Sequence, residues 1–321
     1  MSLRCASIVT FLAALSASGW AAEGWQQQIA TGLGKAGSEM PGGVYRVGLP
    51  RSDLKVVLDG VELKPAFALG SWLAFVRHGG ANEVVVMGDL VLTDDEINPV
   101  MKRLAEGGVE VTAIHNHLLR NQPHTMYMHV SGRGEPGKLA ATLRNALGQS
   151  KTPLGGTPAG SSPQATAQAP SPASAGEGPV SATPASPDQK LDLDTAAIDQ
   201  ALGRKGKVNG GVYQVSVPRA ETPRDNGMDV PEAMGSAIAI NFQPTGTGKA
   251  AITGDFVLTA DEVNPVLRVL RANGIEVTAL HNHMLDDEPR LFFMHFWAND
   301  DAQKLAKGLA AALEKVKVAK S

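Results

Sequence analysis

Residues 277–283 read Val-Thr-Ala-Leu-His-Asn-His, and His295 follows twelve positions later. Nearly the same pattern occurs earlier, where residues 111–117 read Val-Thr-Ala-Ile-His-Asn-His and His129 follows at the same spacing. The whole chain contains only eight histidines, and six of them lie in these two stretches. General histidine richness therefore does not explain the pattern. The sequence predicts two related sites.

The two stretches belong to a longer internal duplication. Residues 88–93 (Gly-Asp-Leu-Val-Leu-Thr) match residues 254–259 (Gly-Asp-Phe-Val-Leu-Thr), and the match continues without a gap to the last histidine at a constant offset of 166. Upstream, Gly-Gly-Val-Tyr occurs at 42–45 and again at 210–213. A repeat this long is a whole domain rather than a solenoid unit.

The segment between the repeats is rich in Pro, Ala, Ser and Gly, with eight of the twenty prolines and no aromatic residue. Such a composition cannot bury enough apolar surface to fold and predicts a flexible linker. We therefore expect four regions: a signal peptide at 1–21, a first repeat domain at 25–147, a linker at 148–190 and a second repeat domain at 193–316.

Each repeat contains apolar strand-like runs and amphipathic helical runs without regular alternation. Apolar runs at 82–92 and 249–258 predict strands, and the segments that follow to Ala105 and Ala272 predict helices. Asp59-Gly60 and Asn226-Gly227 are favourable hairpin turns. The expected fold class is α+β, with two homologous domains that each consist of a mostly antiparallel sheet with helices packed on it.

The motifs carry a resemblance to a known family. Residues 254–267 (GDFVLTADEVNPVL), 274–285 (GIEVTALHNHML) and 292–297 (FFMHFW) resemble the LppY/LpqO family of bacterial exported proteins, whose domain has unknown function. The resemblance covers both repeats and implies export, but it implies no catalytic residues. Named members are lipoproteins, and this chain lacks their lipid-attachment box.

The N-terminus has the order of segments typical of a cleavable signal peptide. Arg4 is followed by an apolar run at 8–17 that is too short to span a bilayer. Gly19 and Ala21 then place small residues at −3 and −1 of a cut after Ala21, and Ala17 to Gly19 offers an alternative cleavage site. Cleavage would remove Cys5, the only cysteine, and leave no thiol chemistry. We expect a periplasmic or secreted protein without a transmembrane segment.

Strand geometry predicts that the histidines of each repeat share one face. Side chains alternate along a strand, so His281 and His283 point the same way with Cα atoms ~6.5 Å apart. If His281 is paired directly with His295 on the returning strand, all three imidazoles lie together. His115, His117 and His129 repeat this arrangement. Aromatic residues on the returning strands would form pocket walls, namely Phe293, Trp297 and Tyr127.

Three neutral imidazoles with an open coordination position suit zinc, copper or nickel. Met284 and Met294 lie nearby and are compatible with copper, although methionine is also common core filling. Hydrogen-bonded buried histidines, or histidines lining a pocket for an organic ligand, are the alternatives. Supporting carboxylates could come from Asp255 and Glu262, or from Asp89 and Glu96 in the first repeat. Both glutamates also fit a helix capping box that begins at Thr93 or Thr259. A helix start at Pro99 or Pro265 would instead leave them free.

The residues leave three function classes open. They are a metal-binding protein, a binding module for a small organic or cell-envelope ligand, and a hydrolase that uses a histidine with a carboxylate. Whether the protein is an enzyme, and its oligomeric state, stay open. A net charge of −3 gives no indication of nucleic-acid binding. Acidic residues at 286–288 and bulkier aromatics predict that the second site is the functional one and the first is weaker.

Overall fold

The computed structural model describes residues 24–80, 82–154 and 191–320. The expected signal peptide and most of the expected linker lie outside these residues. Within the linker range, Thr152 is buried and Leu154 packs against the first core, so the folded part of the first half extends to residue 154. In the described residues, no helix is long and apolar enough to cross a membrane.

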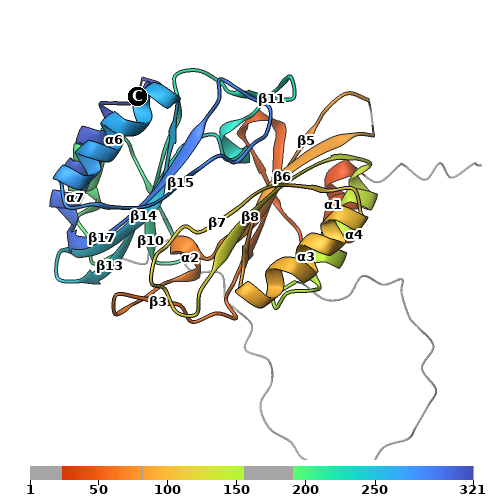
Figure 1. Ribbon diagram of the computed structural model, residues 1–321, viewed down its shortest axis with the longest axis horizontal. Helices are drawn as coiled ribbons and strands as arrows, with labels where there is room; N and C mark the ends of the chain where they lie inside the picture. Colours follow the sequence, from red (N-terminus) through yellow and green to blue (C-terminus); the bar gives the residue numbers. More distant parts are fainter. Residues whose placement is uncertain (1–23, 81, 155–190, 321) are drawn as a thin grey trace, which may run out of the picture.

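The two halves have the same order of main elements, except that η1 occurs only in the first half, β16 occurs only in the second, and η2 takes the place of α2 (Figure 1). The first half comprises α1 (Trp25–Leu33), β1 (Ser38–Met40), η1 (Pro41–Gly43), β2 (Val44–Pro50), β3 (Val57–Leu58), β4 (Val61–Glu62), α2 (Pro65–Ala68), β5 (Gly70–Arg77), β6 (Val84–Leu92), α3 (Asp94–Glu106), β7 (Glu110–His115), β8 (Met126–Gly134) and α4 (Pro136–Leu147). The second comprises α5 (Thr195–Leu202), β9 (Lys207–Asn209), β10 (Val212–Val217), β11 (Arg224–Asp225), β12 (Met228–Asp229), η2 (Glu232–Met234), β13 (Ile238–Gly246), β14 (Lys249–Leu258), α6 (Ala260–Ala272), β15 (Glu276–His281), β16 (Asp287–Glu288), β17 (Phe292–Asp301) and α7 (Ala302–Leu313).

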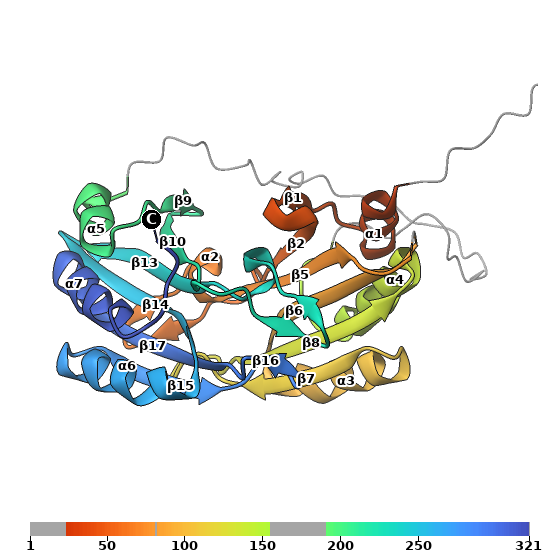
Figure 2. The ribbon, with the colours of Figure 1, turned by 90° about the horizontal axis from the view of Figure 1, so that it is seen from above.

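Each half contains one six-stranded antiparallel sheet. The strand orders are β1-β2-β5-β6-β8-β7 and β15-β17-β14-β13-β10-β9, which are the same order read in opposite directions. Helices α1, α3 and α4 cover the outer face of the first sheet, and α5, α6 and α7 cover that of the second (Figure 2). The predicted α+β class with two similar domains is confirmed.

The inner faces of the two sheets are turned towards each other, and each half extends a segment across to the other. In the first half, the segment from β3 to α2 packs through Phe67 on Trp297 of the second sheet. In the second half, the segment around η2 packs through Gly235 on Trp72 of the first sheet. This reciprocal exchange gives the chain a pseudo-two-fold axis between the sheets.

Equivalent hydrogen bonds support this symmetry. Arg46 Nη1 donates to the Ala233 carbonyl at 2.6 Å, and Gln214 Nε2, at the equivalent position, donates to the Ala66 carbonyl at 2.9 Å. The two halves are therefore anchored to each other by matching contacts rather than joined by the linker alone.

Helices α3 and α6 begin with the predicted capping boxes at Thr93 and Thr259. The alternative start at Pro99 or Pro265 is wrong, since both prolines lie inside the helices. The capping glutamates also meet a buried arginine that the sequence analysis missed. Arg219 Nη1 donates to Glu262 Oε2 at 2.7 Å and to the Val257 carbonyl at 2.6 Å. Arg51 forms the same contacts with Glu96 and the Val91 carbonyl.

We expect the substitution Arg219→Met to destabilise the protein by about 3–5 kcal/mol, because it leaves the buried Glu262 carboxylate without its charged partner. Burial alone would raise the pKa of Glu262, but the hydrogen bonds from Arg219, Lys317 N and Thr259 N lower it overall. Urea denaturation of the full chain measures the change. Arg224→Met is the matched control, since that arginine is exposed and should change stability by about 1 kcal/mol or less.

Candidate metal centre

The six repeated histidines form one cluster between the two sheets. Their rings make three stacked pairs, and each pair takes one ring from each half. The ring centroids are 3.5 Å apart for His115 and His281, 3.8 Å for His117 and His295, and 3.6 Å for His129 and His283. The last two pairs exchange with each other under the pseudo-two-fold axis. The sequence predicts two related sites and leaves open whether they are separate or shared; the structure brings all six histidines into one cluster.

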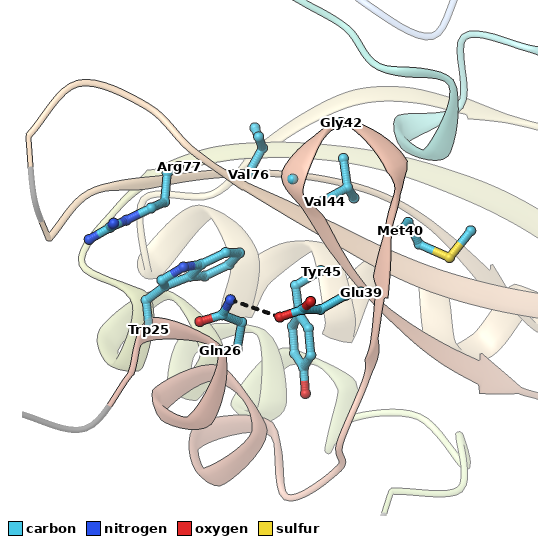
Figure 3. A pocket seen from close by; sticks show the side chains of 10 residues that line it. Trp25, Gln26, Glu39, Met40, Gly42, Val44, Tyr45, Val76 and Arg77 are labelled. Carbon is cyan, nitrogen blue, oxygen red and sulfur yellow. Dashed lines mark hydrogen bonds between the residues drawn. The ribbon is translucent and has the colours of Figure 1, made fainter.

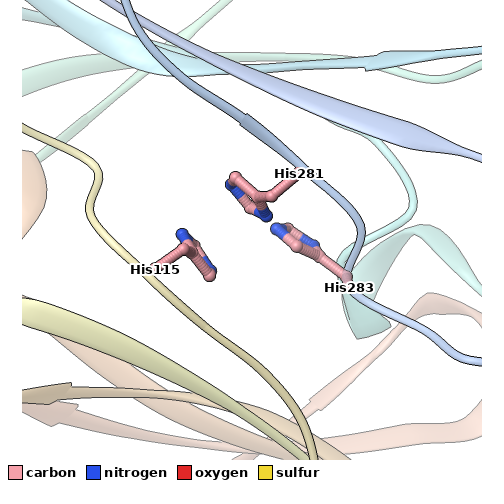
Figure 4. A group of neighbouring side chains, drawn as sticks. All are labelled: His115, His281 and His283. Carbon is pink, nitrogen blue, oxygen red and sulfur yellow. The ribbon is translucent and has the colours of Figure 1, made fainter.

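Two groups of three histidines bring their ring nitrogens within 4.8 Å of one another. One group is the predicted first-repeat set, His115, His117 and His129. The other combines His115 with His281 and His283 of the second repeat, and Figure 4 shows these three rings turned towards one another. His115 belongs to both groups, so the centre cannot be divided cleanly between the repeats.

The strand register differs from the predicted one by two residues. His295 lies opposite Ala279, and His281 lies opposite Phe293. The pairing of β15 with β17 is irregular between Val277 and Ala279, and β7 has the same irregularity between Val111 and Ala113. A shift by two residues keeps the same side chains on the same face, so the histidines of a repeat still share one face.

The threonine at each irregularity connects the two halves. Thr112 Oγ1 donates to the His283 carbonyl at 2.6 Å, and Thr278 Oγ1 donates to the His117 carbonyl at 2.5 Å. These bonds hold the loop residue of each His-Asn-His motif against the strand of the other repeat. The sequence did contain a signal for this role, because Val-Thr-Ala occurs before the motif in both copies.

Hydrogen bonds fix the tautomers of several rings. The Nδ1 atoms of His115, His281 and His295 lie 3.3, 3.2 and 2.9 Å from the carbonyl oxygens of Asn116, Asn282 and Gly254, respectively. A carbonyl oxygen can only accept, so each Nδ1 carries the proton and donates it. The neutral ring then has its lone pair on Nε2, which is the arrangement found in metal-bound histidine.

The Nε2 atoms of all six histidines are buried and, within the described part of the chain, have no hydrogen-bond partner. Burial of the rings lowers the pKa of His115 to about 3 and that of His281 to about 4, and nearby histidines add to the effect at His115. Burial also holds the pKa values of the other four well below their usual range. The cluster therefore consists of neutral imidazoles at pH 7.

Two of the predicted carboxylates lie beside this cluster. Asp89 Oδ2 is 3.7 Å from His117 Nε2, and Asp89 Oδ1 is 3.9 Å from His129 Nε2. These distances are too long for hydrogen bonds. Asp255 is opposite His295 in the sheet, as Asp89 is opposite His129. Burial raises the pKa of Asp255 to about 7, and burial together with Asp255 raises that of Asp89 well above its usual range.

A glycine before each aspartate lets the neighbouring strand approach closely. A Cβ atom placed on Gly254 would lie 1.9 Å from the Ala239 carbonyl oxygen, so no other residue fits there without a backbone shift. The Ala239 amide donates to Asp255 Oδ1 at 3.3 Å. The repeated Gly-Asp pair thus positions a carboxylate on the strand next to the histidines.

The other predicted site residues divide into two groups. Tyr127 stacks on His117 and Phe293 stacks on His283, each with 3.4 Å between ring centroids, so both form walls of the cluster. Trp297 instead packs on Phe67 and donates from Nε1 to Asp59 at 3.1 Å. Glu96 and Glu262 are not supporting carboxylates, because their oxygens are taken by the capping bonds and the buried arginines.

A cleft of about 1400 Å³ leads to the histidines between the inner faces of the sheets. Asp89, Asp255 and four of the histidines line it, together with Arg46 and Trp72, which the sequence analysis did not single out. A smaller pocket of about 430 Å³ lies near β1, where Trp25 and Tyr45 meet edge to face (Figure 3). None of its lining residues is a histidine.

A family model for a domain of unknown function, DUF1259, matches residues 27–149 and 196–315. The chain belongs to this family. It carries two DUF1259 domains, and the two matched segments correspond to the two sheets and their helices. The six clustered histidines are therefore contributed three by each DUF1259 domain.

Comparisons with other proteins add little to this assignment. No curated protein sequence matches the chain. Solved structures that align with it include a trimeric bacterial microcompartment shell protein, PduB, and EtuB from Clostridium kluyveri, both 10% identical in sequence. The PduB alignment covers 87% of this chain and 89% of that one with a TM-score of 0.24, and the EtuB alignment covers 87% and 90% with a TM-score of 0.19. Overlaps this weak do not establish a shared fold.

Proposed function

We propose that this protein binds a divalent transition metal, zinc, copper or nickel, in one centre built by both DUF1259 domains. The observation that carries the proposal is the set of six buried Nε2 atoms without partners. A buried polar atom left unsatisfied costs about 1–3 kcal/mol. Six of them cost on the order of 10 kcal/mol, which approaches the whole stability of a domain. Metal coordination would satisfy these atoms.

The residues present fit such an ion. Neutral imidazoles are its usual ligands, and the Nδ1 donors to backbone carbonyls are the typical supporting contacts around ligating histidines. Tyr127 and Phe293 would exclude water from two sides of the centre. Met284 and Met294 both pack in the hydrophobic core, and Met284 also lines the cleft beside the histidines.

Elemental analysis of protein purified without chelator tests the proposal. We expect at least one ion per chain, because the histidines form one centre. Protein that is free of metal, and that also fails to bind added zinc, copper or nickel, would overturn the proposal. The protein would then be better described as a binding module with a histidine-lined cleft.

A second candidate function is hydrolysis, and Asp255 is the observation that favours it. A buried carboxyl with a pKa near 7 is suited to give or take a proton at neutral pH. Asp255 and Asp89 both line the cleft beside the histidines, so a substrate bound there would have an acid–base group within reach. If a hydrolysed substrate is found, a pH–rate profile without an ionisation near 7 would argue against this role.

We also propose that the protein is exported, as the N-terminal pattern and the motifs shared with the LppY/LpqO proteins suggest. Support comes from Arg4, the apolar run at 8–17 and the small residues Gly19 and Ala21. N-terminal sequencing of the mature protein should then begin at Ala22. A mature chain that keeps Met1 would contradict export by this signal.

A further inference from the structure

The two walls of the cleft differ, although the histidine centre between them is symmetric. The first wall carries Arg46, Trp72 and Met87. By strand register, the equivalent positions in the second wall are Gln214, Ala239 and Thr253. At these three positions one wall presents a cation on an aromatic surface, while the other presents neutral groups. Lys207 on β9 of the second half also lines the cleft.

Arg46 is held in a fixed orientation. Its guanidinium lies 4.1 Å from the centre of the Trp72 ring, and one of its nitrogens donates to the Ala233 carbonyl at 2.6 Å. The Trp72 ring is itself held from the second half, because a Cβ atom on Gly235 would lie 3.1 Å from it. A guanidinium fixed on both sides loses little conformational freedom when it binds a ligand.

No carboxylate in the described residues forms an ion pair with Arg46. Burial lowers its pKa to about 10, with attraction from Asp89 opposing this shift, so the group remains charged at pH 7. In contrast, Arg51 and Arg219, which are buried, are both paired with glutamates. A guanidinium has five N–H donors in a planar fork, and Arg46 forms one hydrogen bond to the described residues.

The register relates Arg46 to the metal centre. Arg46 lies opposite Ala74, and Trp72 on that strand lies opposite Asp89, so Arg46 and Asp89 share the face that lines the cleft. Two strand spacings and two residues along the strand separate them, which is ~12 Å between Cα atoms. A molecule that reaches from the guanidinium to the histidines is therefore small.

We propose that the cleft binds a small organic anion whose carboxylate or phosphate group is held by Arg46 while the rest of the molecule extends towards the histidine centre. A fixed arginine fork matches the geometry of both kinds of anionic group. The Arg46 contact stands without a metal, whereas the position of the far end of the ligand rests on the proposed metal centre. Gln214 and Asn241 on the opposite wall are polar but neutral.

Arg46→Gln is a well-matched test variant, because Gln214 at the equivalent position already makes the equivalent hydrogen bond to the other half. The variant should fold and keep the contact with Ala233 while losing the charge. Arg133→Gln removes the same charge from an exposed ion pair with Glu83 and serves as the control.

Calorimetric titration of the full chain with oxalate, succinate, citrate and inorganic phosphate measures the effect, with succinamide as the uncharged probe. We expect wild type and Arg133→Gln to bind at least one of these anions, Arg46→Gln to bind it at least tenfold more weakly, and none of them to bind succinamide. A panel in which no anion binds wild type more tightly than Arg46→Gln would overturn the proposal. Comparing the carboxylate and phosphate arms identifies the group that the arginine prefers.

The titrations are run on chelator-treated and on metal-loaded protein, with metal content measured in each. Loss of anion binding in Arg46→Gln at unchanged metal content assigns the effect to the guanidinium. Wild type that binds no metal would contradict the proposed metal centre, yet the Arg46 comparison on the same sample would still decide the anion site.

Discussion

Replacing His115 and His117 together by alanine should abolish tight metal binding to the same extent as replacing His281 and His283. The rings of the two halves alternate in three stacked pairs, and His115 belongs to both three-histidine groups. Each double variant therefore removes ligands from the same centre. Altering a residue that only supports a metal ligand already costs 10–100-fold in affinity. Losing two ligands should weaken binding by about 100-fold or more.

Titration with zinc, copper or nickel after chelator treatment gives the affinities. His78→Ala with His124→Ala is the control, since these are the two histidines outside the motifs and should leave metal affinity unchanged. Circular dichroism confirms that each variant folds. If one motif variant retained wild-type affinity while the other lost it, the centre would belong to one repeat, as the sequence alone had suggested.

Much of the fold could be predicted because the relevant signals are local. The Asp59-Gly60 and Asn226-Gly227 turns do connect two short strands, with positive φ at all four residues. The capping boxes also fixed the helix starts, although the competing proline signal pointed five residues further on. In each case the deciding interaction lies within a few residues of the signal.

The parts that could not be predicted depend on contacts between the repeats. Nothing within one repeat shows that its inner sheet face packs against the other copy, since an alternating strand indicates burial but not the partner. The irregularity at Thr278, which shifts the β15–β17 register by one residue, also could not be predicted, because the Thr278 hydroxyl is engaged by the other half. The sequence contained one further signal, which the sequence analysis did not use. Arg46 is a charged residue on an otherwise apolar strand, and it differs from Gln214 in a well-matched segment.

The metal-free protein should lose stability steeply as the pH falls from about 6.5 towards 4. The unfolded histidines take up protons below their ordinary pKa of 6.5, whereas folded His115 and His281 resist protonation down to pKa values of about 3 and 4. Between pH 6.5 and 4 the unfolded state binds more protons than the folded state, so lowering the pH favours unfolding. Each such histidine contributes about 1.4 kcal/mol per pH unit.

Asp255 has the opposite effect on the pH dependence of stability, but more groups act in the direction of the histidines. Its pKa of about 7 in the folded state lies above the unfolded value of 3.8, so its contribution to stability is complete below pH 3.8 and is lost as the pH rises to 7. Asp89 has a shift of the same sign. Two carboxyls oppose six histidines whose pKa values are all lowered, and the net effect of acid is therefore destabilising.

Urea denaturation at pH 7.5, 6, 5 and 4 in the presence of chelator measures this dependence. For His115 and His281 alone, the fall between pH 6.5 and 4 is on the order of 7 kcal/mol, comparable to the total stability of a typical domain. The double variant His115→Ala with His281→Ala should show a shallower dependence of stability on pH, by about two protons per molecule. The His78 and His124 control should keep the wild-type dependence.

Bound metal should raise the denaturation midpoint at pH 7.5 and lose this effect in acid, because protons and the metal compete for the same Nε2 lone pairs. A stability that stays flat down to pH 4 in the metal-free protein would mean that the six imidazoles are hydrated rather than buried, and the basis for the metal centre would be lost with it.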